Sequence, residues 1–75
     1  MEALEKAISL LGSRSALARK IDYTPQLVGM MVNGQARISA EVAMAIQIAT
    51  DNAVMVYELR PDLPWREIMQ PKKMT

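Results

Sequence analysis

The chain of 75 residues contains no cysteine and no histidine. The absence of cysteine excludes disulfide bonds and cysteine nucleophiles, and the absence of both residues excludes Cys/His zinc sites and histidine general bases. An enzyme would have to use carboxylates and lysines, and no pair of these stands at a suggestive spacing. We therefore expect a protein that is not an enzyme, with no catalytic residue, no metal and no cofactor.

The sequence also lacks a hydrophobic run of the roughly 20 residues that a membrane span needs, because Gln47 and then Thr50 to Asn52 interrupt its longest apolar stretch. Glu2 and Glu5 stand where a secretory signal would be basic. Absence of cysteine is also typical of cytosolic proteins. We predict a cytoplasmic protein with no membrane partner and no small-molecule ligand.

The chain is short, so we expect one domain over residues 1–69, followed by a disordered basic tail over 70–75 that carries Lys72 and Lys73. A chain of this length buries only about 60–65% of its unfolded surface. The core is therefore thin and must rely on tight helix packing or on a partner chain.

The net charge is only +1, but the charges are segregated along the chain. Residues 12–37 carry Asp22 against four cations, which are Arg14, Arg19, Lys20 and Arg37. Residues 38–69 carry two arginines against five carboxylates, which are Glu41, Asp51, Glu58, Asp62 and Glu67. Such segregation is typical of a protein that binds a polyanion with one face, and it also fits an ordinary mixed surface.

Apolar spacing and capping residues predict four helices. The first ends at Gly12, and its apolar stripe is Leu4, Ala7, Ile8 and Leu11. The second is capped by Ser13 or Ser15, turns Leu17, Ala18 and Ile21 inward, and ends near Asp22. The third begins at Pro25 after the N-cap Thr24 and runs to about Asn33, with Gly34 as its left-handed stop. The fourth runs from Ala40 to about Ala49, with Ser39 as its N-cap.

The third helix contains a glycine, Gly29, at a cost of about 1 kcal/mol relative to alanine. Its inward side is formed by Val28 and Met31, with Leu27 as a further candidate. A helix that tolerates this glycine indicates that another group approaches it closely on that face.

Residues 53–60 are ambiguous. Val54, Val56 and Tyr57 favour a strand, but Pro61 follows at once and no partner strand is visible. We interpret 56–60 as a short helical turn and leave the strand alternative open. Residues 65–69 are expected to add one more turn.

The fourth helix is apolar on almost every side, since only Glu41 and Gln47 are polar. Such a helix is buried on more than one face. Either two chains pair through it, or the proline-rich C-terminal segment folds back over it within one chain. The candidate contacts of a homodimer are Val42, Ile48, Met55 and Trp65.

Only residues 22–24 separate the second helix from the third, which is the spacing of a helix–turn–helix unit. In a DNA-binding unit of this kind the second of the two helices enters the major groove. The candidate base contacts are then Thr24, Pro25, Gln26, Met30 and Asn33. The candidate phosphate contacts are Arg14, Arg19, Lys20, Gln35 and Arg37. Such spacing also occurs in helical bundles that bind no DNA, where the same polar residues are solvated surface and Met30 is core.

Residues 13–34 resemble the helix–turn–helix of the Cro/CI repressor superfamily, with Ala18 at the helix crossing. Residues 3–12, 40–50 and above all the Glu-Leu-Arg-Pro-Asp run at 58–62 followed by Trp65 are similar to YdaS-like, Cro-type prophage regulators. The resemblance implies an all-α fold, a small four- to five-helix bundle of the lambda-repressor type. It implies a Cro-like repressor that binds double-stranded operator DNA in the major groove, as a homodimer, in a bacterial host.

The chain departs from this pattern at a few positions. Asp22 replaces the usual turn glycine, Pro25 moves Gln26 by one position, and Val42 and Ile48 stand where relatives are commonly charged. The alternative function is an antitoxin-like or protein-interaction module of a prophage toxin–antitoxin pair, with DNA binding as autoregulation.

Overall fold

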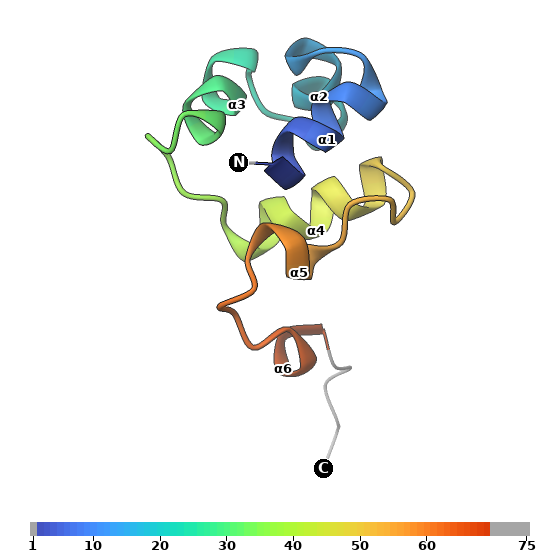
Figure 1. Ribbon diagram of the computed structural model, residues 1–75, viewed down its shortest axis with the longest axis vertical. Coiled ribbons are helices and arrows are strands. Elements are labelled where there is room, and N and C mark those ends of the chain that lie inside the picture. The colour runs from blue at the N-terminus through green and yellow to red at the C-terminus, as the bar shows by residue number, and fades with distance from the viewer. Residues whose placement is uncertain (1, 70–75) are drawn as a thin grey trace.

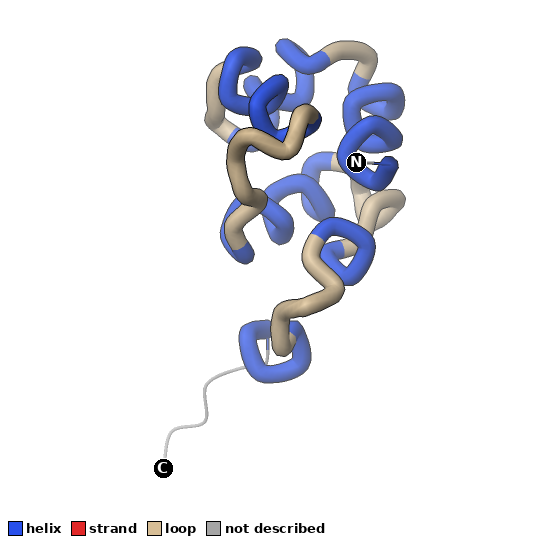
Figure 2. The backbone as a smooth tube through the Cα atoms, turned by 60° about the vertical axis from the view of Figure 1, so that its left-hand side comes forward, coloured by secondary structure: helices blue, strands red, loops and turns tan. Residues whose placement is uncertain are grey.

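A computed structural model describes residues 2–69, so the predicted tail lies outside the described residues. These residues form six helices and no strand: α1 (Glu2–Leu11), α2 (Arg14–Ile21), α3 (Pro25–Val32), α4 (Ala40–Ala49), α5 (Val56–Leu59) and α6 (Trp65–Met69). The three N-terminal helices gather at one end, α4 and α5 lie across the middle, and α6 stands at the other end (Figures 1 and 2). The all-α fold is confirmed, and α5 decides against a strand within 53–60.

The helices begin where the capping residues predict. Ser13, Thr24 and Ser39 each accept a hydrogen bond through the side-chain oxygen from the backbone N–H three residues on, at 3.0, 3.1 and 3.2 Å. Ser13, and not Ser15, is therefore the cap of α2. A side-chain acceptor here satisfies one of the N–H groups that a helix leaves unpaired at its start.

The turn between α2 and α3 depends on a left-handed residue. Asp22 adopts φ 63° and ψ 44°, and the Tyr23 N–H then donates to the Ala18 carbonyl oxygen at 2.7 Å. Aspartate visits this region more readily than most residues because its short polar side chain hydrogen-bonds locally. The chain thus keeps the tight turn without glycine, and α3 packs across α2.

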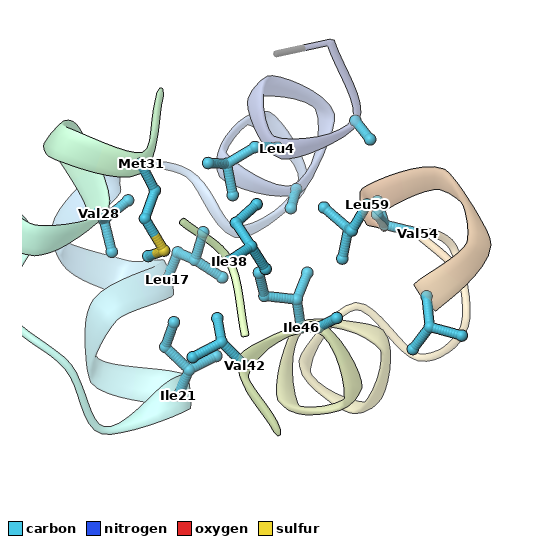
Figure 3. Close-up of a cluster of buried hydrophobic side chains, with 14 of the residues drawn as sticks. Leu4, Leu17, Ile21, Val28, Met31, Ile38, Val42, Ile46, Val54 and Leu59 are labelled. Atoms are coloured by element: carbon cyan, nitrogen blue, oxygen red, sulfur yellow. The ribbon is translucent and has the colours of Figure 1, made fainter. Parts of the chain in front are cut away.

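The core joins the helix–turn–helix to α4. Leu4, Leu17, Val28 and Ile46 are fully buried, and Met31 reaches toward Leu17 while Ile21 lies beside Val42 (Figure 3). Helix α4 contacts both α2 and α5, so most of its apolar surface is covered by the chain itself, while Ile48 stays exposed. The close packing of these side chains fixes the orientation of α3.

Two of the four interface candidates have almost no exposed surface in the single chain. Val42 is 3% exposed and lies beside Ile21 of α2 (Figure 3). Trp65 is 2% exposed, and the C-terminal segment that carries it adds Val54, Val56 and Leu59 to the core. The burial of Val42 and Trp65 argues against these two as dimer contacts. Met55 is half-buried, and Ile48 is 77% exposed.

Two polar side chains fix the connection between α4 and α5. The Thr50 hydroxyl donates to the Ile46 carbonyl oxygen at 2.9 Å and accepts from the Val54 N–H at 3.1 Å. The Gln47 amide oxygen accepts from the Val56 N–H at 2.9 Å. These bonds satisfy backbone groups that the packing removes from water.

The Glu-Leu-Arg-Pro-Asp run ends in a hydrogen-bonded group that we call the C-terminal clasp: Arg60, Asp62 and Trp65. Arg60 donates from Nε and Nη2 to the two Asp62 carboxylate oxygens, at 2.9 and 2.7 Å. Its Nη1 reaches the Ile38 carbonyl oxygen at 2.6 Å, and its own carbonyl oxygen accepts from Trp65 Nε1. The clasp ties the C-terminal segment to the connection between α3 and α4.

Candidate nucleic-acid interface

One edge of α3 is free of the core. Gln26, Met30 and Asn33 are exposed, whereas Val28 and Met31, on the opposite side of the helix, are buried. Residues spaced by four and seven lie on one side of a helix, so the three side chains share an edge. Asn33 is the C-cap, with φ −84° and ψ 0°, and the edge therefore ends there.

The start of α3 is exposed as well. Thr24 and Pro25 are both solvent-accessible. The Thr24 hydroxyl oxygen is occupied as an acceptor for the Leu27 N–H, which leaves its proton able to donate. Pro25 has no N–H and offers only its ring. The predicted base contacts therefore all have solvent-accessible side chains on or beside the exposed face of α3.

The predicted phosphate contacts come from the elements that precede and follow α3. Arg14 comes from the start of α2, Arg19 and Lys20 from its last turn, and Gln35 and Arg37 from the connection after α3; all five are exposed. Among residues 2–69 none of the four cations forms an ion pair. Their charge is therefore available to an external anion.

Arg14 lies against α3 at the glycine. A Cβ placed on Gly29 would stand 3.2 Å from Arg14 Nη1. The close approach predicted from Gly29 is thus found, and the approaching group is a guanidinium. Since Gly29 is three residues after Gln26 and four before Asn33, Arg14 lies beside their edge.

Tyr23 is a candidate that the sequence analysis missed. It is 38% exposed in the turn, and with Ser15, Ala18, Arg19 and Pro25 it lines a shallow hollow of about 250 Å³ beside the start of α3. A hydroxyl-bearing ring two residues before the helix-starting proline was the available signal.

A second hollow, of about 460 Å³, lies between the connection after α3 and the clasp. Asn33, Gly34 and Arg37 line it from one side and Arg60 and Asp62 from the other. The hydrogen bonds from Arg60 lower the pKa of Asp62 from 3.8 to about 2, because they stabilise the carboxylate. Asp62 is therefore ionised at neutral pH and balances the charge of Arg60.

Other kinds of site are not found in the described part of the chain. Over residues 2–69 no group of three or more histidine, cysteine, aspartate or glutamate side chains could hold a metal ion. In the same span no helix combines the length and apolar character that crossing a bilayer requires.

Comparison with known proteins gives two matches. A family model described as "Bacterial toxin YdaS" matches residues 4–68. The protein of Escherichia coli (strain K12) named "Putative transcriptional regulator YdaS" is 35% identical over 63 residues, which cover 84% of this chain and 64% of that protein. The chain thus spans somewhat less than two thirds of the relative's length. No solved structure matches.

Proposed function

The chain belongs to the YdaS family, and from this premise we propose that it is a non-catalytic, sequence-specific DNA-binding regulator of transcription in the cytoplasm of a bacterial host. One observation carries the proposal. The exposed edge of Gln26, Met30 and Asn33 is accompanied by exposed cations on α2 and after α3 that form no ion pair within residues 2–69. A recognition helix between phosphate-binding side chains has this arrangement.

Base recognition falls to the side chains at the start and along the edge of α3. The Gln26 amide can bridge N6 and N7 of adenine, and the Met30 side chain can pack on a thymine methyl group. Asn33 offers a second amide about two helical turns after Gln26. Thr24 and Pro25 meet the DNA where the helix begins.

Affinity comes from the cations. Arg14, Arg19, Lys20 and Arg37 each neutralise a phosphate, and Gln35 adds an uncharged contact. Each neutralised phosphate releases a condensed counterion, so the binding constant falls with salt by a slope of about 0.9 per contact. Of the acidic residues after position 38, Asp62 borders the hollow that Asn33 and Arg37 line, and Arg60 balances its charge there.

We propose further that two chains bind as a homodimer and repress transcription by covering the promoter. A two-fold dimer places its recognition helices about 34 Å apart, in successive major grooves. Ile48, at 77% exposure, supports a contact on α4. Sedimentation of Ile48→Glu against the unaltered protein tests this contact, and an unchanged mass removes the reason for naming it.

Selection of bound sites from random duplex DNA tests the proposed function most directly. We expect a palindrome with half-sites about 10 base pairs apart.

Two variants separate base recognition from phosphate binding. Gln26→Ala should relax the sequence preference, whereas Arg14→Ala should weaken binding to every sequence and lower the salt slope by about one. Arg66→Ala, which removes an exposed cation on α6, is the control and should change neither quantity. Equal, weak binding of random and selected DNA at low salt contradicts the proposal.

The family description supports a second proposal, that the chain inhibits bacterial growth when it is expressed without a partner protein. Such inhibition would follow from DNA binding if Arg14→Ala and Gln26→Ala relieve it. If both variants inhibit growth as strongly as the unaltered chain, the protein acts through another macromolecule, as in a toxin–antitoxin pair. Growth curves after induced expression separate these outcomes.

A further inference from the structure

The connection between α3 and α4 is fixed at its two ends by different parts of the molecule. Its first residues are held by α3, since the N–H groups of Gln35 and Ala36 both donate to the Met30 carbonyl oxygen, at 2.8 and 3.2 Å. At its other end the side chain of Ile38 is buried, and the Ile38 carbonyl oxygen accepts from Arg60 Nη1 at 2.6 Å. Arg37, directly before Ile38, therefore has its backbone position set partly by a residue 22 positions beyond Ile38.

Arg60 is itself held rigidly. Its guanidinium makes two bonds to the Asp62 carboxylate, and its side chain is only 20% exposed. Its carbonyl oxygen accepts from Trp65 Nε1, and Trp65 is buried in the core. Hydrogen bonds thus link the buried Trp65, through the clasp, to the connection after α3.

The two arginines that border the same hollow differ in what remains open to a ligand. The charge of Arg60 is balanced by Asp62, and three of its nitrogen atoms already donate to protein oxygens. Arg37 is exposed and forms no ion pair within residues 2–69. Arg37 can therefore bind a phosphate, whereas Arg60 is suited to hold the backbone that carries it.

We propose that Arg60 is a positioning residue for DNA binding: through the Ile38 carbonyl it holds Arg37 beside the recognition edge of α3. This inference rests on the proposed DNA-binding function and assigns a role to the Glu-Leu-Arg-Pro-Asp run. The planar guanidinium satisfies two carboxylate oxygens and a carbonyl oxygen at once, which a lysine ammonium on a flexible stem does not reproduce.

Arg60→Lys is the sharpest test because it leaves the net charge unchanged. Affinity for a selected DNA site is measured as a function of salt, at a temperature where thermal melting shows the variant to be folded. We expect Arg60→Lys to weaken binding by about tenfold and to lower the salt slope by about one, as Arg37→Ala does. A purely structural role would leave the slope unchanged.

Double variants add a matched control. The effects of Arg60→Lys and Arg37→Ala should not add, because both remove the same phosphate contact. Arg60→Lys and Arg14→Ala should add, because Arg14 comes from α2, approaches α3 at Gly29 and shares no contact with the clasp. If Arg60→Lys fails to fold, Trp65→Phe replaces it, since phenylalanine keeps a ring in the core but lacks the N–H that donates to Arg60.

Each outcome has a definite meaning. An unchanged salt slope, or additive effects of the Arg60 and Arg37 substitutions, overturns the positioning role while leaving DNA binding intact. If the unaltered protein binds no duplex at low salt, the proposed function and this inference both fail. Non-additivity with Arg37 together with additivity with Arg14 supports the role.

Discussion

The two halves of the molecule use their polar side chains differently. From residue 13 to residue 37, side-chain hydrogen bonds come only from Ser13 and Thr24, and each cap bonds three residues along its own helix. After residue 46, Gln47, Thr50, Glu58, Arg60, Asp62 and Trp65 all bond within the chain. In the C-terminal half most polar side chains form hydrogen bonds within the chain. In the helix–turn–helix most polar side chains form none and are accessible to a ligand.

The charges follow the same division. The four cations of residues 12–37 belong to α2 and to the connection after α3, whereas carboxylates outnumber cations in residues 38–69. A phosphate backbone attracts the first region and repels the second, so in the proposed function the field of the protein would orient its approach to DNA.

The largest expected effect tests whether the C-terminal half is structural. Trp65→Ala removes a ring that is 2% exposed, and we expect the free energy of unfolding to fall by about 3–5 kcal/mol. Chemical denaturation measures this. Leu10→Ala, at an exposed position of α1, is the control and should change the stability by less than about 0.5 kcal/mol. A loss below 1 kcal/mol for Trp65→Ala would mean that α6 is not part of the core.

Loss of the Thr50 hydroxyl should have the second-largest effect on the free energy of unfolding. Thr50→Val keeps the shape of the side chain but leaves the buried Val54 N–H without its acceptor. We expect a loss of about 1–3 kcal/mol in the free energy of unfolding. Thr50→Ser keeps the hydroxyl and should retain most of the stability, and equal losses for the two variants would show that the methyl group, not the hydrogen bond, matters.

Within the helix–turn–helix, Gly29→Ala should be stabilising. Alanine gains up to about 1 kcal/mol of helix propensity, and the nearest neighbour is the exposed end of Arg14, which can move aside. Thermal melting of Gly34→Ala provides the contrast, because Gly34 has φ +78° and an alanine there is strained. A lower melting temperature for Gly29→Ala would show that Arg14 cannot yield.

The smallest expected effect is the loss of folding stability at low pH that Asp62 contributes. The folded pKa of Asp62 is about 2, below its ordinary 3.8, so the folded state binds this proton less tightly than the unfolded state. Its contribution to stability is therefore complete above about pH 4 and is lost as the pH falls toward 2. Since Asp62 is 62% exposed, solvent weakens the pair. Denaturation of Asp62→Asn should show a smaller loss of stability between pH 4 and 2 than the unaltered protein.

Local features of the fold could be predicted from the sequence because they depend on neighbouring residues. Thr24 followed by Pro25 marks the start of α3, and the left-handed Asp22 preserves the turn. The exposed edge of α3 follows from helical periodicity once its inward side is identified. Of the site, the placement of the candidate base and phosphate contacts on the surface was therefore accessible, and their role in DNA binding stays a prediction.

Contacts between distant segments could not be predicted in this way. Nothing local indicates that Arg60 bonds to Ile38, or that Trp65 and Val42 are both buried. The apolar character of α4 showed that it must be covered, but not that its own chain covers it. Periodicity describes one helix at a time, whereas the covering of a face is decided by the packing of the whole chain.

The isolation of the recognition edge has an evolutionary consequence. Gln26, Met30 and Asn33 make no side-chain hydrogen bond to the rest of residues 2–69 and supply nothing to the core. Each can be exchanged without disturbing the scaffold that carries it. Under the proposed function, a lineage of such proteins could acquire new target sequences one substitution at a time while every intermediate still folds.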